Sequence, residues 1–151
     1  MNKFKPNDLP KKYREQIKNK NKSRPKNEGE SKLIIPGELP TQNEMVNKSK
    51  THWNKYRDMK EKYEKIIGCC IEQQEIPFYE SIHLDITYYR TNRRHDPDNI
   101  VAAKKIILDA FQKIGVIEND GWKQVKGFTE SWEVDKENPR TEIKIKKREE
   151  Y

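Results

Sequence analysis

The sequence has 151 residues, of which 38% are charged and 32% hydrophobic, so it fits a single domain with a lean core. Residues 1–32 contain 11 Lys or Arg and 4 Asp or Glu, whereas the other 119 residues carry 21 of each sign, so the N-terminal segment accounts for the whole net charge of +7. No apolar stretch approaches the length of a membrane span, and the N-terminus is too polar for a signal peptide. We therefore expect a cytoplasmic protein with no membrane partner.

The N-terminal segment, residues 1–31, is predicted to be a flexible basic tail because it has hardly any apolar residue to bury after Ile17. A short helix near residues 11–18 is compatible with its composition. Such a tail could attract DNA through sequence-independent contacts with phosphates. The alternative is a solvated tail that has no partner.

The only cysteines, Cys69 and Cys70, are adjacent, and no spacing of Cys and His resembles a zinc site. This pattern argues against disulfide staples and thiolate metal sites. We expect two buried free thiols.

The first half of the remaining chain is predicted to contain a strand, a helix and a second strand. Residues 32–36 favour a strand that ends at a Pro-Gly turn. Residues 43–67 have the three- and four-residue spacing of a long amphipathic helix, and residues 82–88 alternate as in a strand with one buried face. The expected core stripe of the helix is Trp53, Tyr56, Met59, Tyr63, Ile66 and Ile67.

The second half is predicted to contain a helix and two further strands. A helix over residues 97–114 would have Asp96 as its cap, Pro97 in its first turn and Gly115 in the left-handed position after its end. Strands are expected near residues 124–134 and 141–146. The order β-α-β-α-β-β over residues 32–151 indicates an α+β two-layer sandwich. The expected buried stripe of the second helix is Ile100, Ile107, Phe111 and Ile114.

Residues 93–99 (RRHDPDN) are the most informative segment, because two carboxylates and an amide lie at the junction of a strand and a helix. Asp96 and Asp98 could reach one hard divalent cation such as Mg²⁺, while Arg93 and Arg94 offset their repulsion and attract phosphate. In the alternative reading Asp96 is only a helix cap, and Asp98 only a favourable charge near the helix N-terminus.

Two further residues complete the candidate site. On a continuous helix Lys105 lies within roughly 20° of the face of Asp98, whereas Lys104 points away, so Lys105 is the lysine expected to approach a bound phosphate. The alternative for Lys105 is an ion pair with Asp109 one turn away, and the two roles could coexist. Asp120 could return beside the strand-helix junction as a third carboxylate, although the segment Asn-Asp-Gly is also typical of an ordinary turn.

Together these residues suit metal-assisted phosphodiester cleavage, in which carboxylates position Mg²⁺, a metal-bound water is the nucleophile and a lysine stabilises the developing charge. No Ser-His-Asp arrangement, phosphate-binding glycine loop or dinucleotide fingerprint is present.

Over about residues 33–146 the chain resembles the RusA family of Holliday junction resolvases, which is common in bacteria and their prophages. The likeness is carried by residues 96–99 (DPDN), Lys105 with residues 108–111 (LDAF), residues 115–117 (GVI) and residues 119–120 (ND). Residues 39–43 (LPTQN) also resemble a proline-containing segment near the N-terminus of the family.

The resemblance implies a homodimeric enzyme that depends on Mg²⁺, with Mn²⁺ as a possible substitute, and makes paired nicks in four-way DNA junctions during recombination and repair. It assigns catalysis to Asp96, Asp98, Lys105 and Asp120, the metal to the three carboxylates, and DNA contacts to Arg93, Arg94 and Lys105.

Three departures from the family pattern stand out. The interval from Asp98 to Asp109 is longer than usual, so Lys105 is aligned from the Asp109 side. Asn119 takes a position that is often Asp, and His95 takes one that is often Arg, which would shift phosphate contact to Arg93 or Arg94.

Two other functions remain open on the sequence alone. One is a non-catalytic DNA-binding protein of the same fold, and the other is a nuclease for other branched DNA. Cleavage of a panel of DNA shapes in the presence of Mg²⁺ separates them.

Overall fold

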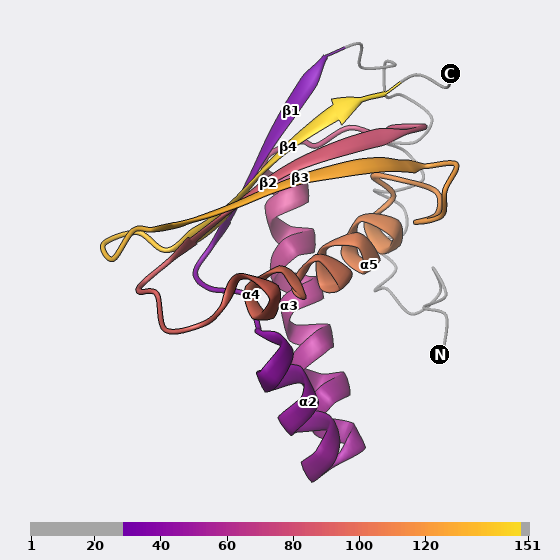
Figure 1. The fold of residues 1–151 in the computed structure, drawn as a ribbon. Helices are drawn as coiled ribbons and strands as arrows, with labels where there is room; N and C mark the ends of the chain where they lie inside the picture. Colours follow the sequence, from indigo (N-terminus) through magenta and orange to yellow (C-terminus); the bar gives the residue numbers. More distant parts are fainter. Residues whose placement is uncertain (1–28, 149–151) are drawn as a thin grey trace.

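The computed structural model describes residues 29–148, which form two layers (Figure 1). One layer is a four-stranded sheet, and helices cover one of its faces. In chain order the elements are β1 (Glu30–Pro36), α2 (Gln42–Thr51), α3 (Trp53–Gln73), β2 (Ile82–Arg90), α4 (Pro97–Val101), α5 (Lys104–Ile114), β3 (Val125–Val134) and β4 (Arg140–Lys147). The predicted α+β two-layer architecture is confirmed.

The predicted helix over residues 43–67 is interrupted, so its continuity was predicted wrongly. The backbone of His52 is extended, which ends α2, and the ring Nδ1 of His52 accepts a hydrogen bond from the amide of Asn54 at 3.2 Å, which caps α3. The sequence has no glycine or proline at this break. The side chain of His52 supplies the cap of the new helix instead. The helix α3 then continues to Gln73.

The predicted helix over residues 97–114 is also divided, at Ala102 and Ala103. The amide of Ala103 donates to the carbonyl of Ile100 at 3.3 Å, and that of Lys105 to the carbonyl of Ala102 at 3.3 Å, which are the bonds of a tighter turn. Alanine has the highest helix propensity of any residue, so the sequence favours an unbroken helix here. The buried position of Ala103 indicates that packing overrides this propensity.

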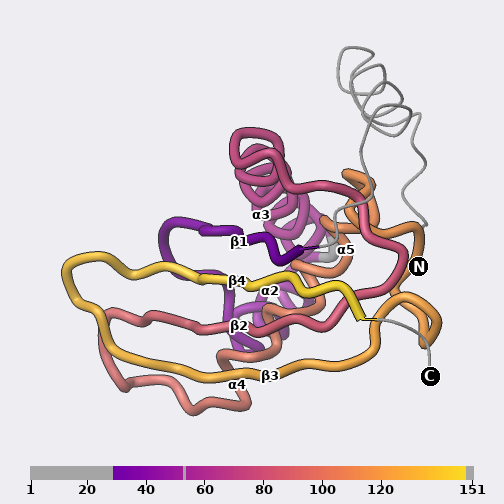
Figure 2. The backbone as a smooth tube through the Cα atoms, turned by 90° about the horizontal axis from the view of Figure 1, so that it is seen from above, coloured from indigo at the N-terminus to yellow at the C-terminus, as the bar shows by residue number. Residues whose placement is uncertain are grey.

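The sheet has the strand order β1-β4-β2-β3, in which β2 and β3 are parallel and the other pairs antiparallel (Figure 2). The parallel pair is joined by α4 and α5, as parallel strands require a crossover connection. Alternate residues of β2 are buried beneath the helices, as predicted. They are Ile82, Leu84, Ile86 and Tyr88.

The predicted helical stripes lie in or against the core. The whole predicted stripe of α4 and α5 is buried, and α5 ends at Gly115, whose φ of 88° is the left-handed conformation that favours glycine. In α3, Ile67 is buried, and Tyr56, Met59, Tyr63 and Ile66 pack against the core. The side chain of Trp53 lies outside the described part of the structure.

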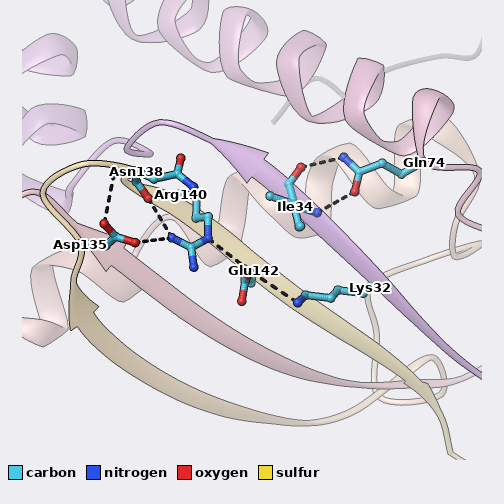
Figure 3. A network of polar contacts seen from close by, with 7 residues as sticks. All are labelled: Lys32, Ile34, Gln74, Asp135, Asn138, Arg140 and Glu142. Atoms are coloured by element: carbon cyan, nitrogen blue, oxygen red, sulfur yellow. Dashed lines mark hydrogen bonds and ion pairs between the residues drawn. The ribbon is translucent and has the colours of Figure 1, made fainter.

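Side chains secure β1 and the turn between β3 and β4 (Figure 3). The side-chain amide of Gln74 accepts from the amide of Ile34 at 2.8 Å and donates to its carbonyl at 2.7 Å, so the end of α3 satisfies the outer edge of β1. Arg140 donates to Asp135 at 2.8 Å and to Glu142 at 3.2 Å, and Glu142 pairs with Lys32 at 3.5 Å. These contacts fix the register of β1 and β4.

The other predictions concern the tail, the cysteines and membrane association. Most of the predicted tail and its possible short helix, residues 1–28, lie outside the described residues, and β1 begins at Glu30. Both thiols are free, but only Cys70 is buried, because Cys69 lies on the exposed side of α3. Between residues 29 and 148, no helix has the length and apolar character needed to cross a bilayer.

Candidate functional site

The carboxylates of the DPDN motif stand in the exposed entry to α4. The carboxylate of Asp98 accepts a hydrogen bond from the amide of Asn99 at 2.9 Å. Asp96 occupies the predicted N-cap position, but its side chain makes no capping hydrogen bond. Neither carboxylate forms an ion pair with any residue that the structure describes. Both remain available to a ligand.

The amide of Asn99 ties this motif to the start of α2. Its side-chain oxygen accepts from the amide of Asn43 at 2.9 Å, and its nitrogen lies 3.4 Å from Nδ1 of His95. Thr41, which is buried, accepts from the amide of Glu44 at 3.3 Å and caps the same helix. Residues 39–43 (LPTQN) therefore support the DPDN motif, a role that the sequence alone did not indicate.

The loop that precedes the motif is held at its base by Arg90. This buried guanidinium donates to the carbonyl of Leu39 at 3.1 Å and pairs with the carboxylate of Glu38 at 3.3 Å. Burial opposes ionisation of Glu38, but hydrogen bonds from Thr91 and the charge of Arg90 outweigh it and lower the pKa of Glu38. Beyond this anchor, Arg93 and Arg94 are exposed.

Lys105 lies between two carboxylates. Its ammonium nitrogen is 3.1 Å from Oδ1 of Asp109 and 3.7 Å from Oδ2 of Asp120. The expected ion pair with Asp109 is thus present, and Lys105 still has a 49% exposed side chain. The division between α4 and α5 removes the continuous-helix argument for Lys105, but its contact with Asp120 places it in the candidate site.

The neighbouring lysine has a different environment. The ammonium of Lys104 contacts the carboxylate of Glu130 on β3 and lies 4.3 Å from the centre of the Phe128 ring. Lys104 therefore links α5 to the sheet, whereas Lys105 points to the turn that carries Asp120. This contrast agrees with the expectation that the two lysines point in different directions.

A chain of alternating charges connects Lys105 to the interior. The second carboxylate oxygen of Asp109 is 2.7 Å from the ammonium of Lys60 on α3, and Lys60 is 3.8 Å from Glu64. Glu64, only 6% exposed, also accepts from Lys113 on α5. Partial burial alone would lower the pKa of Lys60, but the hydrogen bond and charge of Asp109 raise it. We refer to Lys105, Asp109, Lys60, Glu64 and Lys113 as the ion-pair cluster.

Sequence reasoning missed most of this cluster. Spacings of four residues, as between Lys60 and Glu64 or between Asp109 and Lys113, signal pairs along one helix. The strongest contacts instead join α3 to α5, and spacing along the chain does not reveal them.

The structure does not gather all the predicted carboxylates at one point. Asp120 contacts Lys105, while Asp96 and Asp98 lie at the entry to α4. Over residues 29–148 there is no group of three or more His, Cys, Asp or Glu side chains placed to hold a metal ion. The candidate site thus has two parts, the DPDN motif and the ion-pair cluster with Asp120.

A family model described as endodeoxyribonuclease RusA matches residues 36–146. The chain belongs to the RusA family. No curated protein matches the sequence. The matched segment contains both parts of the candidate site and leaves the basic N-terminal residues outside. As a RusA-family member, the chain is an endodeoxyribonuclease of the Holliday junction resolving type, and its partner is branched DNA.

The stretch between Asp98 and Asp109, where the sequence departs from the expected RusA spacing, contains a break between two helices. The extended interval between Asp98 and Asp109 contains Ala102 and Ala103, where α4 ends and α5 begins. Within α5, Lys105 keeps its one-turn spacing to Asp109.

The donors of this RusA-family site fit a hard cation by their chemistry. Asp96 at the N-cap of α4 and Asp98 in its first turn supply exposed carboxylate oxygens, and Asp120 supplies a third carboxylate. Magnesium ions in proteins usually keep several waters and are held by one or two carboxylates together with substrate phosphate oxygens. A pair of carboxylates at the motif therefore meets the usual requirement even though three ligands are not gathered in the free chain.

Proposed function

We propose that this chain resolves Holliday junctions by Mg²⁺-dependent hydrolysis of phosphodiester bonds, with Asp96, Asp98, Asp120 and Lys105 as its catalytic residues. One observation carries the proposal: Lys105 lies 3.7 Å from the carboxylate of Asp120, although the two residues come from different elements. An ammonium and a carboxylate held together, with the lysine seven residues after an exposed acidic motif, suit the stabilisation of charge on a phosphate.

Asp96 and Asp98 would hold the metal, and Asp120 would add a third carboxylate once DNA is bound. Mg²⁺, or Mn²⁺ in its place, supplies Lewis-acid activation of water and of the phosphate when bound. Lys105 stabilises the negative charge that develops on the phosphate oxygens. Asp109 would keep Lys105 in place through the contact at 3.1 Å.

Contacts with the DNA backbone are assigned to Arg93, Arg94 and Lys105. The two arginines are exposed in the loop before the motif, where their planar guanidinium groups suit phosphate oxygens. Such contacts position the substrate and carry no sequence information.

The resemblance to junction resolvases also supports a homodimer that acts in recombination and repair. A four-way junction has two strands to cut symmetrically, and a two-fold dimer presents two equivalent sites to them. Light scattering of the purified chain, alone and with junction DNA, measures the stoichiometry. A single chain per junction would contradict the dimer.

The proposal is tested by cleavage of a synthetic four-way junction with and without Mg²⁺. Asp98→Asn should abolish nicking and leave junction binding nearly unchanged, because it removes charge at the metal with little change in volume. Retained nicking by this variant would refute the assignment. Binding without any cleavage by the wild type would favour a non-catalytic protein, and preference for flaps would favour another branched substrate.

The basic N-terminal residues are predicted to add electrostatic affinity. Deletion of residues 1–28 removes 10 Lys or Arg and 3 Asp or Glu, and should weaken junction binding more at low salt than at high salt. Equilibrium binding over a range of salt concentrations measures the slope. An unchanged slope would leave these residues without a role in binding DNA.

A further inference from the structure

Trp122 is the most exposed large hydrophobic residue among those whose side chains the structure describes, with 96% of its surface accessible. Single exposed apolar side chains are common on protein surfaces and have no meaning by themselves. The position of Trp122 sets it apart, because it follows Asp120 by two residues. Two residues span at most about 7 Å of backbone, so the indole starts close to the candidate site.

The backbone beneath Trp122 is fixed by hydrogen bonds. The amides of Gln124 and Val125 donate to the carbonyl of Gly121 at 3.2 and 2.9 Å, which closes the turn around Trp122. The carbonyl of Gln124 accepts from the amide of Ile82 at 2.7 Å, which joins the turn to β2. The indole is therefore presented on a preformed support, and binding through it costs little backbone ordering.

Basic segments join the described chain at the same end of the sheet. Strand register aligns the start of β1, the end of β4 and the start of β3 there, with Glu30 opposite Lys146 and Ile82 opposite both Lys147 and Val125. Figure 1 shows these strand ends gathered on one side. The 28 residues that precede Gly29 hold 10 Lys or Arg and 3 Asp or Glu.

We propose that Trp122 stacks on a nucleobase at the branch point of the DNA, next to the strand that is cut, and so helps the enzyme to select branched over linear DNA. This inference rests on the proposed function. An aromatic ring can stack on any base face, but the bases of a linear duplex are already stacked on their neighbours. At a branch point the strands exchange between arms and the stack is easier to open, so exposing a base face to the indole costs less there than inside a linear duplex.

The inference predicts a selective loss of affinity. Trp122→Ala should weaken binding to a four-way junction by about 5- to 150-fold, the range expected for loss of one base-aromatic stack. Binding to a linear duplex of the same length should change less than twofold. Trp122→Phe should restore most of the affinity for the junction, because a smaller aromatic ring still stacks.

A neighbouring residue supplies the matched control. Lys123→Ala alters an exposed charge on the same turn, so its effect should shrink as salt rises, whereas the loss in Trp122→Ala should keep its size. Quenching of tryptophan fluorescence by the junction gives a second readout, and should be smaller in Trp122→Phe than in the wild type at saturating DNA.

The outcomes separate this inference from the proposed function. Unchanged junction affinity in Trp122→Ala, or an equal loss with linear duplex, overturns the stacking role even if Asp98→Asn abolishes cleavage. Full cleavage by Asp98→Asn instead overturns the proposed active site, whatever Trp122 does.

Discussion

The two parts of the candidate site are held in different ways. The DPDN motif lies in a five-residue helix and is joined to α2 mainly by the neutral hydrogen bond between Asn99 and the amide of Asn43 at 2.9 Å. Lys105 instead belongs to a series of ion pairs that ends at the buried carboxylate of Glu64. One part is exposed and lightly supported, and the other is anchored in the packing of α3 against α5.

This difference matches the work that each part would perform. Residues that take up a metal and a phosphate must lose water and change partners, so exposure and light support suit them. A cation that stabilises developing charge is most effective when its position is set before the reaction, because no free energy is then spent on reorganisation. The ion-pair cluster provides that preorganisation for Lys105.

Apart from loss of a carboxylate of the DPDN motif, the largest effect is expected when Lys105 itself is removed. Lys105→Ala should lower the cleavage rate by about 10²- to 10³-fold, as expected for loss of a group that stabilises transition-state charge. Its folding stability should change little, since the side chain is half exposed. Single-turnover cleavage and thermal denaturation measure the two quantities.

Lys104→Ala is the matched control, because Lys104 contacts Glu130 and Phe128 on β3. It should retain most of the cleavage activity. A severe loss of cleavage in Lys104→Ala with normal rates in Lys105→Ala would reverse the assignment of the two lysines.

A smaller effect on cleavage is expected at the inner end of the ion-pair cluster. Glu64→Gln leaves Lys113 and Lys60 without their shared carboxylate, and should reduce the free energy of unfolding by about 1–3 kcal/mol, a value reduced for the partial exposure of both lysines. Chemical denaturation measures it. Cleavage should fall moderately if the cluster positions Lys105.

Glu61→Gln makes the same change on the exposed side of α3 and should alter stability by less than about 0.5 kcal/mol. Equal effects of the two variants would show that the cluster has no special contribution.

The smallest effect is expected at the support of the motif. Asn99→Ala removes the acceptor for the amide of Asn43 and should cost about 1 kcal/mol of folding stability. Because α4 would then be less firmly placed, cleavage should fall more than stability suggests. Asn99→Asp keeps the acceptor oxygen and should recover the stability, and failure to recover it would remove the proposed tie between α2 and α4.

Much of the fold could be read from local patterns. The alternation of residues 82–88 predicted the buried face of β2, and the placement of Gly115 predicted the end of α5. These features depend on neighbours along the chain, which the sequence displays directly. The two helix breaks were not predicted, because neither His52 nor the pair Ala102 and Ala103 is a usual helix breaker. The first break is capped by the side chain of His52, and the second lies at the buried Ala103.

By itself the sequence determined the α+β class, the family, the separation of charge between the N-terminal residues and the rest, and the choice of Asp96, Asp98, Lys105 and Asp120 as candidates. Only the tertiary structure decided which charged side chains meet. The contact between Lys113 and Glu64 joins residues 49 positions apart, and it exists because α3 packs against α5. Ion pairs of this kind depend on distance and burial in space, and those quantities are set by the packing of whole elements.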